Sequence, residues 1–226
     1  MYDFCFFTFD FLFFGFCFKG QRFFYYEYIK LINNTLFRFF CFFKDYSYLC
    51  KFNAKIQCFF DMMRIGILSD THGTLPEQVF TFFERCDEIW HAGDIGPGVL
   101  DRLRSFKPTV AVFGNMDAWD LRYQLSETQL FCREGFKVVM THIGGYPDHY
   151  ERRIRPLLLS EKPDIFVAGH SHILRVMYDK TYNLLHINPG AAGRQGFHQV
   201  STLVRLTLDD KPKDLEICEF DKFPIE

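Results

Sequence analysis

Two histidines, His170 and His172, follow Gly169 at the end of the apolar run 165–168. Their spacing lets both imidazoles face the same small volume, and imidazole is the commonest metal ligand in proteins. A lone histidine pair is more often solvated or hydrogen-bonded than bound to a metal. The pair therefore gains meaning only from what the rest of the chain places beside it.

The same arrangement recurs along the chain. Five apolar, strand-like runs each end in a small residue and one or two potential ligands, in order Asp70 and His72, Asp94, Asn115, His142, and His170 and His172. Taken singly, an aspartate here could cap a helix and an asparagine could belong to a turn. Because ligands gather outside the carboxyl ends of strands in α/β sheets, we expect all seven side chains to meet.

Seven ligands are too many for one ion and suit two. Carboxylate, amide and imidazole donors without thiolate favour hard or borderline divalent metals; we expect manganese, with nickel, iron, cobalt and zinc as alternatives. Asp94 is the natural bridging carboxylate. Two ions about 3.5 to 4 Å apart hold a hydroxide between them and clamp both oxygens of an in-line displacement at phosphorus. The expected chemistry is thus phosphate ester hydrolysis.

The elements that must position these side chains alternate between strands and helices. Apolar runs predict strands at 63–69, 88–92, 109–113, 136–140 and 165–168, and helices at 76–86, 99–105, from about 118, and at 150–160. Further strands are expected at 174–178, 184–187, 202–208 and 215–220, with hairpin turns at Asp179-Lys180 and Asp209-Asp210. This order predicts an α/β domain in which a mixed sheet is covered by helices.

The first 61 residues differ in composition from the remainder. They hold 19 of the 30 phenylalanines and five of the eight cysteines, but no proline and no histidine. We therefore expect two parts, an N-terminal extension at 1–61 and a catalytic domain at 62–226.

Three interpretations of this extension compete. Asp3 and Asp10 and the lack of a small-residue cleavage site argue against a secretory signal, and the run 4–18 is short for a membrane span. The third interpretation is that the extension is read from A/T-rich upstream DNA and is disordered or not part of the natural protein. Met62 would then be the true start, directly before the first strand.

Charge and cysteine usage limit the partners. Residues 62–226 carry 19 Lys and Arg against 23 Asp and Glu, a net charge of -4, and show no basic cluster, so we expect no nucleic-acid and no membrane partner. Cys86, Cys132 and Cys218 are widely spaced and show no metal or disulfide pattern, which is typical of a cytoplasmic protein. The sequence leaves open whether the chain forms a homo-oligomer.

The motif series resembles that of the calcineurin-like metallophosphoesterase superfamily over residues 62 to about 220. The motifs are Asp70-x-His72, Gly93-Asp94, Gly114-Asn115-x-Asp117, His142, and Gly169-His170-x-His172. The chain length and Asn188-Pro189-Gly190 resemble the small bacterial and archaeal phosphodiesterases, relatives of the retromer subunit Vps29. The resemblance implies a two-sheet α/β sandwich with helices outside.

The resemblance also implies roles for individual residues. Asp70, His72 and His172 would hold one ion, Asn115, His142 and His170 would hold the other, and Asp94 would bridge them. Asp94, Asn115 and His142 would act directly in catalysis. Many members have a histidine at the position of Met116, which is thought to protonate the leaving group. Methionine cannot donate that proton, so we expect activated aryl phosphodiesters to react better than alkyl monoesters.

The expected activity is that of a metal-dependent phosphodiesterase acting on a small phosphodiester. Arg194, in the glycine-rich loop 188–194, could contact a phosphate oxygen of the substrate. Two alternatives remain, a Vps29-like protein-interaction scaffold and a nuclease. The seven retained ligands argue against the scaffold, and the acidic balance argues against the nuclease.

Overall fold

The computed structural model describes residues 62–223 in full and only the backbone of residues 8–9, 11–18, 21–32 and 35–42. The chain divides into two units, Met1–Phe59 and Phe60–Glu226. In the first unit, β1 (Thr8–Phe9), β2 (Phe11–Phe18), β3 (Gln21–Ile32) and β4 (Thr35–Phe42) form an antiparallel sheet in chain order. The expected start at Met62 stays a prediction, since residues 43–61 lie outside those described.

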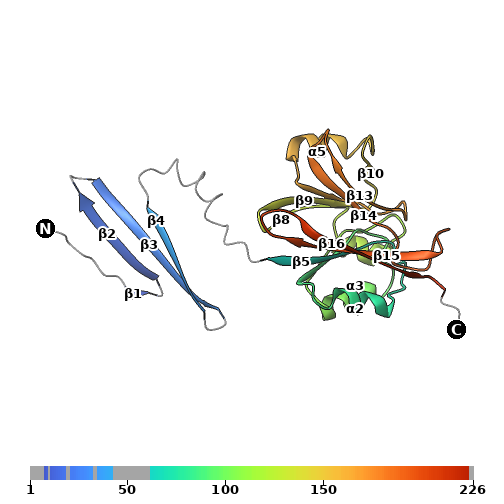
Figure 1. Ribbon diagram of the computed structural model, residues 1–226, viewed down its shortest axis with the longest axis horizontal. Helices are drawn as coiled ribbons and strands as arrows, with labels where there is room; N and C mark the ends of the chain where they lie inside the picture. The colour runs from blue at the N-terminus through green and yellow to red at the C-terminus, as the bar shows by residue number, and fades with distance from the viewer. Residues whose placement is uncertain (1–7, 10, 19–20, 33–34, 43–61, 224–226) are drawn as a thin grey trace. The chain divides into compact units, whose positions relative to one another are not determined.

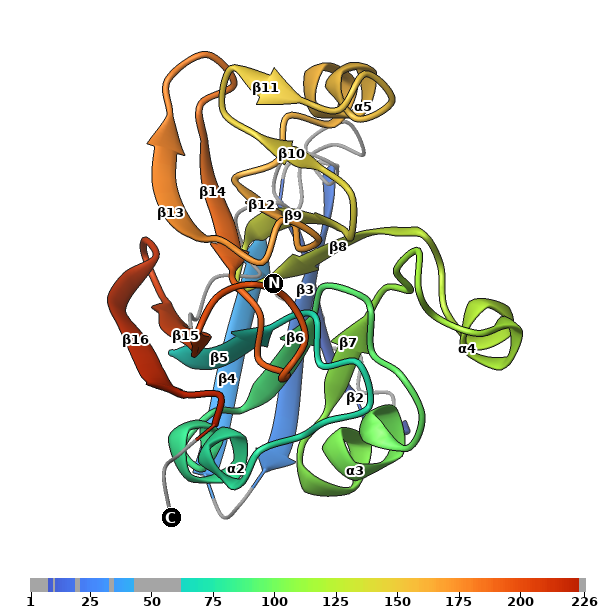
Figure 2. The ribbon, with the colours of Figure 1, turned by 90° about the vertical axis from the view of Figure 1, so that its right-hand side faces the viewer.

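The second unit contains two five-stranded sheets (Figures 1 and 2). The first sheet has the order β16-β15-β5-β6-β7, with β5 (Met63–Leu68), β6 (Glu88–His91) and β7 (Thr109–Ala111) parallel. β15 (Val200–Leu208) pairs antiparallel with β5 and with β16 (Lys213–Asp221). The parallel strands are joined through α2 (Glu77–Phe83) and α3 (Val99–Phe106), as the alternating apolar runs predict.

The second sheet has the order β13-β14-β12-β9-β8. Its central strands β9 (Phe136–Thr141), β12 (Ile165–Val167) and β14 (Leu184–Pro189) are parallel, and β8 (Thr128–Arg133) and β13 (Leu174–Asp179) are antiparallel edges. The short helix α4 (Trp119–Gln124) precedes β8. The hairpin of β10 (Gly145–Tyr146) and β11 (His149–Tyr150) and the helix α5 (Arg155–Glu161) connect β9 to β12.

The two sheets pack face to face and enclose the main core. Ile67, Trp90, Val138, Ile165 and Ile187 are fully buried in it. In Figure 1, α2 and α3 lie outside the first sheet and α5 lies outside the second. This is the two-sheet sandwich implied by the resemblance. It replaces the mixed sheet expected from periodicity, because hydrophobic periodicity identifies strands but not the sheet to which each belongs.

Two local expectations also change. The helix expected at 150–160 begins only at Arg155, because Tyr150 pairs with Gly145 in the β10–β11 hairpin and Pro156 stands in the first helical turn. The apolar pattern does not predict the strand β8, because all six of its residues are exposed or partly exposed and the pattern is short. Among the described residues, no helix is long and apolar enough to cross a membrane.

Candidate metal centre

The predicted ligands come from loops that follow strands of both sheets. Asp70 and His72 follow β5, Asp94 follows β6, His142 follows β9, and His170 and His172 follow β12. Backbone hydrogen bonds tie these loops together, from Asp70 N–H to the Gly93 carbonyl at 3.0 Å and from Gly169 N–H to the His142 carbonyl at 2.9 Å. The six side chains form two groups of three, and within each group the ligand atoms lie within 4.8 Å of one another.

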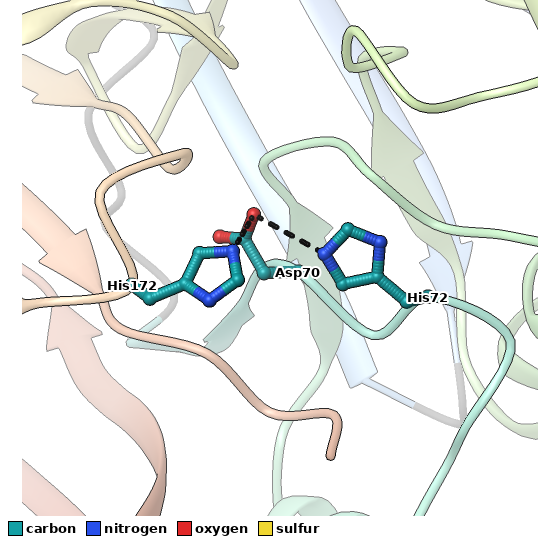
Figure 3. A group of neighbouring side chains, drawn as sticks. All are labelled: Asp70, His72 and His172. Carbon is teal, nitrogen blue, oxygen red and sulfur yellow. Dashed lines mark ion pairs between the residues drawn. The ribbon is translucent and has the colours of Figure 1, made fainter. Parts of the chain in front are cut away.

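The first group is Asp70, His72 and His172. The two imidazoles point at the Asp70 carboxylate from opposite sides (Figure 3). His172 Nε2 lies 3.2 Å and His72 Nε2 lies 4.0 Å from Asp70 Oδ1. The other oxygen, Oδ2, accepts a hydrogen bond from the His170 backbone at 3.2 Å. Asp70 is therefore fixed through one oxygen and offers the other to the two histidines.

The second group is Asp94, His142 and His170. His142 Nε2 lies 3.1 Å from Asp94 Oδ2, and the His170 ring stands edge-on to the His142 ring at 5.2 Å. Asp94 Oδ1 accepts a hydrogen bond of 2.7 Å from the backbone N–H of Met116. Asp94 Oδ2 also lies 3.9 Å from His72 Nε2 of the first group. Asp94 thus faces imidazoles of both groups.

The backbone at these positions is unusual. Asp70, His72, Asp94, His170 and His172 all have positive φ, between 46° and 68°. Left-handed backbone costs about 1–2 kcal/mol for a residue with a Cβ, less for aspartate than for bulky residues. Five of the six grouped residues thus adopt a costly conformation that brings their side chains together. Strain concentrated in this way is characteristic of functional sites.

Three ligand atoms of the centre are buried without a hydrogen-bond partner among the described residues, namely Asp70 Oδ1, His72 Nε2 and His142 Nε2. His142 Nδ1 lies 2.8 Å from the carbonyl oxygen of Ala92, which can only accept, so Nδ1 carries a proton. A neutral His142 would then direct the Nε2 lone pair at the Asp94 carboxylate. Only a cation resolves this repulsion, whether a second proton or a metal ion. The residues present therefore fit a divalent ion.

The pKa values of the protein without metal reflect the same geometry. Burial lowers the pKa of His72, although Asp94 and Asp70 oppose the effect. Burial also disfavours the charged form of His142, but the neighbouring carboxylates of Asp94 and Asp70 outweigh it and raise the pKa of His142. Burial opposes ionisation of Asp94 as well, yet His142 and the Met116 N–H together lower its pKa. Asp94 and His142 thus stabilise each other as an ion pair.

Comparison with known proteins agrees with this geometry. The profile of the calcineurin-like phosphoesterase superfamily domain matches residues 63–211. The chain belongs to this superfamily. A probable metallophosphoesterase of Methanothermobacter thermautotrophicus is 32% identical over 163 residues, which are 69% of this chain and 91% of the relative. Another from Methanocaldococcus jannaschii is 31% identical over 157 residues, 66% of this chain and 78% of the relative.

A solved structure shares the fold of the phosphoesterase domain. A single mutant of Vps29 from Entamoeba histolytica matches with a TM-score of 0.54 at 20% sequence identity, over 70% of this chain and all of that chain. The two-sheet α/β fold expected from the sequence is therefore confirmed. The superfamily is metal-dependent, and this chain presents two candidate metal-binding groups.

Residues behind the ligands hold the phosphoesterase site together. Asp117 accepts hydrogen bonds from Gly114 N–H at 2.8 Å and Gly96 N–H at 2.9 Å, and so joins the loops after β7 and β6. A side chain at Gly114 would lie 2.1 Å from Asp94 Oδ1, which explains the glycine. From the sequence alone, Asp117 could equally cap a helix. The structure gives it a role in positioning the loop of Asn115.

Thr71 and His91 form a second support that the sequence did not indicate. The Thr71 hydroxyl donates to the Ile95 carbonyl at 2.7 Å and lies 2.9 Å from His91 Nε2. Gly93 N–H donates to His91 Nδ1 at 3.2 Å, so Nε2 carries the proton and donates to Thr71. Burial lowers the pKa of His91 to about 3 and keeps the ring neutral. His91 thus fixes the loop between Asp70 and His72 through its hydrogen bond to Thr71.

Three further residues singled out in the sequence are exposed and lie outside the two ligand groups. Asn115 is exposed, and its backbone carbonyl accepts a hydrogen bond of 2.8 Å from the Arg122 guanidinium. Met116 is 67% exposed beside Asp94, to which its N–H donates. Arg194 is exposed and has no hydrogen bond or ion pair within the described part of the chain. Metal binding by Asn115 and substrate binding by Arg194 stay predictions.

A second set of buried polar atoms lies behind the second sheet. We call Tyr150, Asp179 and His186 the Tyr150 cluster. Its atoms without a hydrogen-bond partner, within residues 62–223, are the Tyr150 hydroxyl, Asp179 Oδ2 and both ring nitrogens of His186. The Tyr150 and His186 rings are 5.9 Å apart. Burial lowers the pKa of His186 to about 4, and burial together with Asp179 raises the pKa of Tyr150.

Proposed function

We propose that the phosphoesterase domain is a two-metal phosphodiesterase. The observation that carries the proposal is the pair of adjacent ligand groups, in which buried Asp70 Oδ1, His72 Nε2 and His142 Nε2 have no hydrogen-bond partner in the described chain. Asp70, His72 and His172 would hold one ion, and Asn115, His142 and His170 would hold the other. Asp94 would bridge them, since its Oδ2 faces His72 at 3.9 Å and His142 at 3.1 Å.

Bound ions would supply Lewis acidity, a nucleophilic water and neutralisation of charge on phosphorus. The protein's own contribution is placement. The Met116 N–H and His142 orient Asp94, and the Ala92 carbonyl keeps the His142 proton on Nδ1, so that Nε2 is free to ligate. Manganese is our preferred metal because the donor set is rich in oxygen and imidazole.

The preference for diesters follows from Met116. The residue is exposed and its backbone N–H contacts Asp94, but a thioether cannot protonate a leaving group. A nitrophenolate leaves without protonation, whereas an alkoxide does not. We expect the manganese-loaded protein to hydrolyse bis(p-nitrophenyl) phosphate faster than alkyl monoesters such as glycerol phosphate.

The Met116→His variant tests this assignment. A histidine at this position should raise monoesterase activity by roughly 10²-fold, the lower range for general acid catalysis, while Met116→Leu should leave it unchanged. The measurement is kcat/KM for both substrate classes with manganese, nickel, cobalt and zinc. Equal wild-type activity on the two classes, or a monoesterase preference, would contradict the proposal.

A non-catalytic scaffold is the second candidate, because Vps29 is among the structural neighbours. The two candidates differ in what they require of the ligands. A scaffold needs neither tight divalent binding nor hydrolysis, so calorimetric titration with manganese and zinc separates them. Absence of both tight binding and hydrolysis of bis(p-nitrophenyl) phosphate would favour the scaffold. Oligonucleotide substrates, tested in parallel, address the nuclease alternative.

A further inference from the structure

A pocket of about 380 Å³ lies beside the metal centre, between the start of α2 and the end of β16. Its walls include two cationic side chains, Arg194 and Lys222, and the polar residues Thr74, Gln78 and Ser201. We call it the Lys222 pocket. Neither of the two ligand groups contributes a residue to its wall.

The pocket adjoins the metal centre through two chain segments. Thr74 stands two residues after His72, a span of about 7 Å at most. Gly193 N–H donates to the Asp70 carbonyl at 3.1 Å, and Arg194 follows directly. A side chain at Gly193 would lie 2.3 Å from the Thr71 carbonyl oxygen, so this approach requires glycine. These two segments therefore place the pocket next to the metal centre.

Lys222 is the unusual member of the wall. The residue is 2% exposed, yet its ammonium forms no ion pair within residues 62–223. Nζ donates to the Gln195 carbonyl at 2.6 Å, which uses one of its three hydrogens. A buried charge is costly unless it is paired, and burial lowers the pKa of Lys222 even though the Asp70 carboxylate opposes the effect. Two donors remain for an acceptor in the pocket.

The remaining wall residues favour an anion there. Arg194 adds a second cation to the wall, exposed and without an ion pair within residues 62–223. The pocket also has two carboxylates, but both are exposed, and Glu77 is turned toward Arg102 at 3.5 Å. Asp221 is therefore the one carboxylate of the wall without an ion pair in the described chain, against two cations of which one is buried.

We propose that the Lys222 pocket binds a second anionic group, a phosphate-type oxyanion, carried by the same phosphoester whose scissile phosphate binds at the metal centre. Lys222 and Arg194 would provide the charge, and Thr74 and Gln78 would provide hydrogen-bond donors, since the Ser201 hydroxyl already donates to the Gly193 carbonyl. The inference rests on the proposed function. It narrows the substrate class to phosphodiesters that bear a further phosphate or a similar anion.

The first test measures binding without catalysis. Metal-free protein in excess EDTA is titrated with sodium sulfate at constant ionic strength, and the thermal midpoint is compared with that in chloride. We expect sulfate to raise Tm in the wild type and in the control Lys180→Met, which changes an exposed lysine in the β13–β14 turn. Lys222→Met and Arg194→Gln should each lose most of this shift. A wild type that responds equally to sulfate and chloride would overturn the proposal.

The second test uses two substrates with the same leaving group, thymidine 5′-(p-nitrophenyl phosphate) and its 3′-phosphorylated form. We expect the manganese-loaded wild type to prefer the 3′-phosphorylated ester by tenfold or more in kcat/KM, mainly through KM. Lys222→Met and Arg194→Gln should reduce this ratio toward one, and Lys180→Met should keep it. A ratio near one in the wild type would overturn the substrate assignment, as would an unchanged ratio in both variants.

The two tests separate this inference from the proposed activity. A protein that binds sulfate through Lys222 but hydrolyses neither ester contradicts the phosphodiesterase and leaves free phosphate or sulfate as the ligand. A protein that hydrolyses both esters equally and ignores sulfate contradicts the pocket alone. Arg194→Gln changes an exposed side chain and should fold, so it still tests the pocket if Lys222→Met fails to fold.

Discussion

The metal centre and the Tyr150 cluster are the two places in the phosphoesterase domain where buried polar atoms lack partners within the described chain. Both contain aspartate and histidine. At the metal centre, however, two carboxylates and four imidazoles lie in two tight groups on loops. The Tyr150 cluster has one carboxylate and one imidazole, and they lie on neighbouring strands. Unpaired buried atoms therefore do not by themselves indicate a metal site.

The backbone explains much of this difference. Five of the six ligands at the metal centre have left-handed φ, which turns side chains of successive loops toward one point. In the Tyr150 cluster, Asp179 and His186 have the extended backbone of β13 and β14, and Asp179 Oδ1 accepts the Thr181 N–H of the following turn at 2.7 Å. The Asp179 carboxylate thus stabilises a turn, whereas the carboxylates of Asp70 and Asp94 point at imidazoles.

The largest contrast is expected between the same substitution at the two places. Asp94→Asn removes the bridging charge and should lower kcat/KM for bis(p-nitrophenyl) phosphate by on the order of 10³-fold, because several kcal/mol of charge stabilisation at phosphorus depend on the ions. Asp179→Asn keeps a turn-capping oxygen and should leave kcat/KM within about twofold while lowering stability by about 1 kcal/mol. Similar kinetic losses in the two variants would remove the distinction between the regions.

Single histidine changes should separate the two ions. His170→Ala and His172→Ala lie two residues apart but belong to different groups, so each should reduce the bound metal from two ions to one at a different position. His186→Ala in the Tyr150 cluster should retain both ions. Metal content by mass spectrometry gives the number, and anomalous scattering gives the position. Loss of the same ion in both variants would contradict the division.

Acid should affect the Tyr150 cluster through His186. The folded state holds the pKa of His186 near 4, below the ordinary value of 6.5, because burial disfavours the charged ring. Below pH 6.5 the unfolded chain binds the proton more readily, so stability is complete above 6.5 and falls by about 1.4 kcal/mol per pH unit down to about 4.

Replacing the titrating ring isolates this effect. His186→Phe fits a site already in contact with Phe166 and Tyr150, and it should flatten the dependence of unfolding free energy on pH between 6.5 and 4 relative to the wild type. Urea denaturation of metal-free protein at several pH values measures the slopes. Parallel slopes for the variant and the wild type would show that His186 does not titrate as described.

The smallest effect on metal binding is expected at Thr71, which supports the ligand loop without being a ligand itself. Thr71→Val removes the hydroxyl between His91 and the Ile95 carbonyl while keeping the shape of the side chain. Loss of a supporting hydrogen bond of this kind should weaken metal affinity by roughly tenfold. Thr181→Val, in the turn beside Asp179, is the control. Calorimetric titration with manganese checks the difference, and equal affinities would assign Thr71 to packing alone.

The grouping of the six aspartates and histidines could be predicted from the sequence because each stands after an apolar run, where parallel strands end. Their binding of metal stays a prediction. The partition of those runs into two sheets was not available from periodicity, and it entered through the resemblance. The supporting roles of Thr71 and His91 could not be predicted from the sequence, because they depend on a contact between residues 20 positions apart. The burial of Lys222 could not be predicted either, because a single lysine near the end of a strand gives no sign of burial.

The left-handed backbone of the ligands has an evolutionary consequence. Each of the five strained positions would be relaxed by a change to glycine, worth on the order of 1 kcal/mol in folding free energy. Selection for folding and selection for chemistry thus oppose each other at these positions. In a lineage released from the reaction, ordinary stabilising substitutions would erase the ligands first and leave the sandwich intact. Such a catalyst can become an inert binding partner by drift alone, without passing through an unstable ancestor.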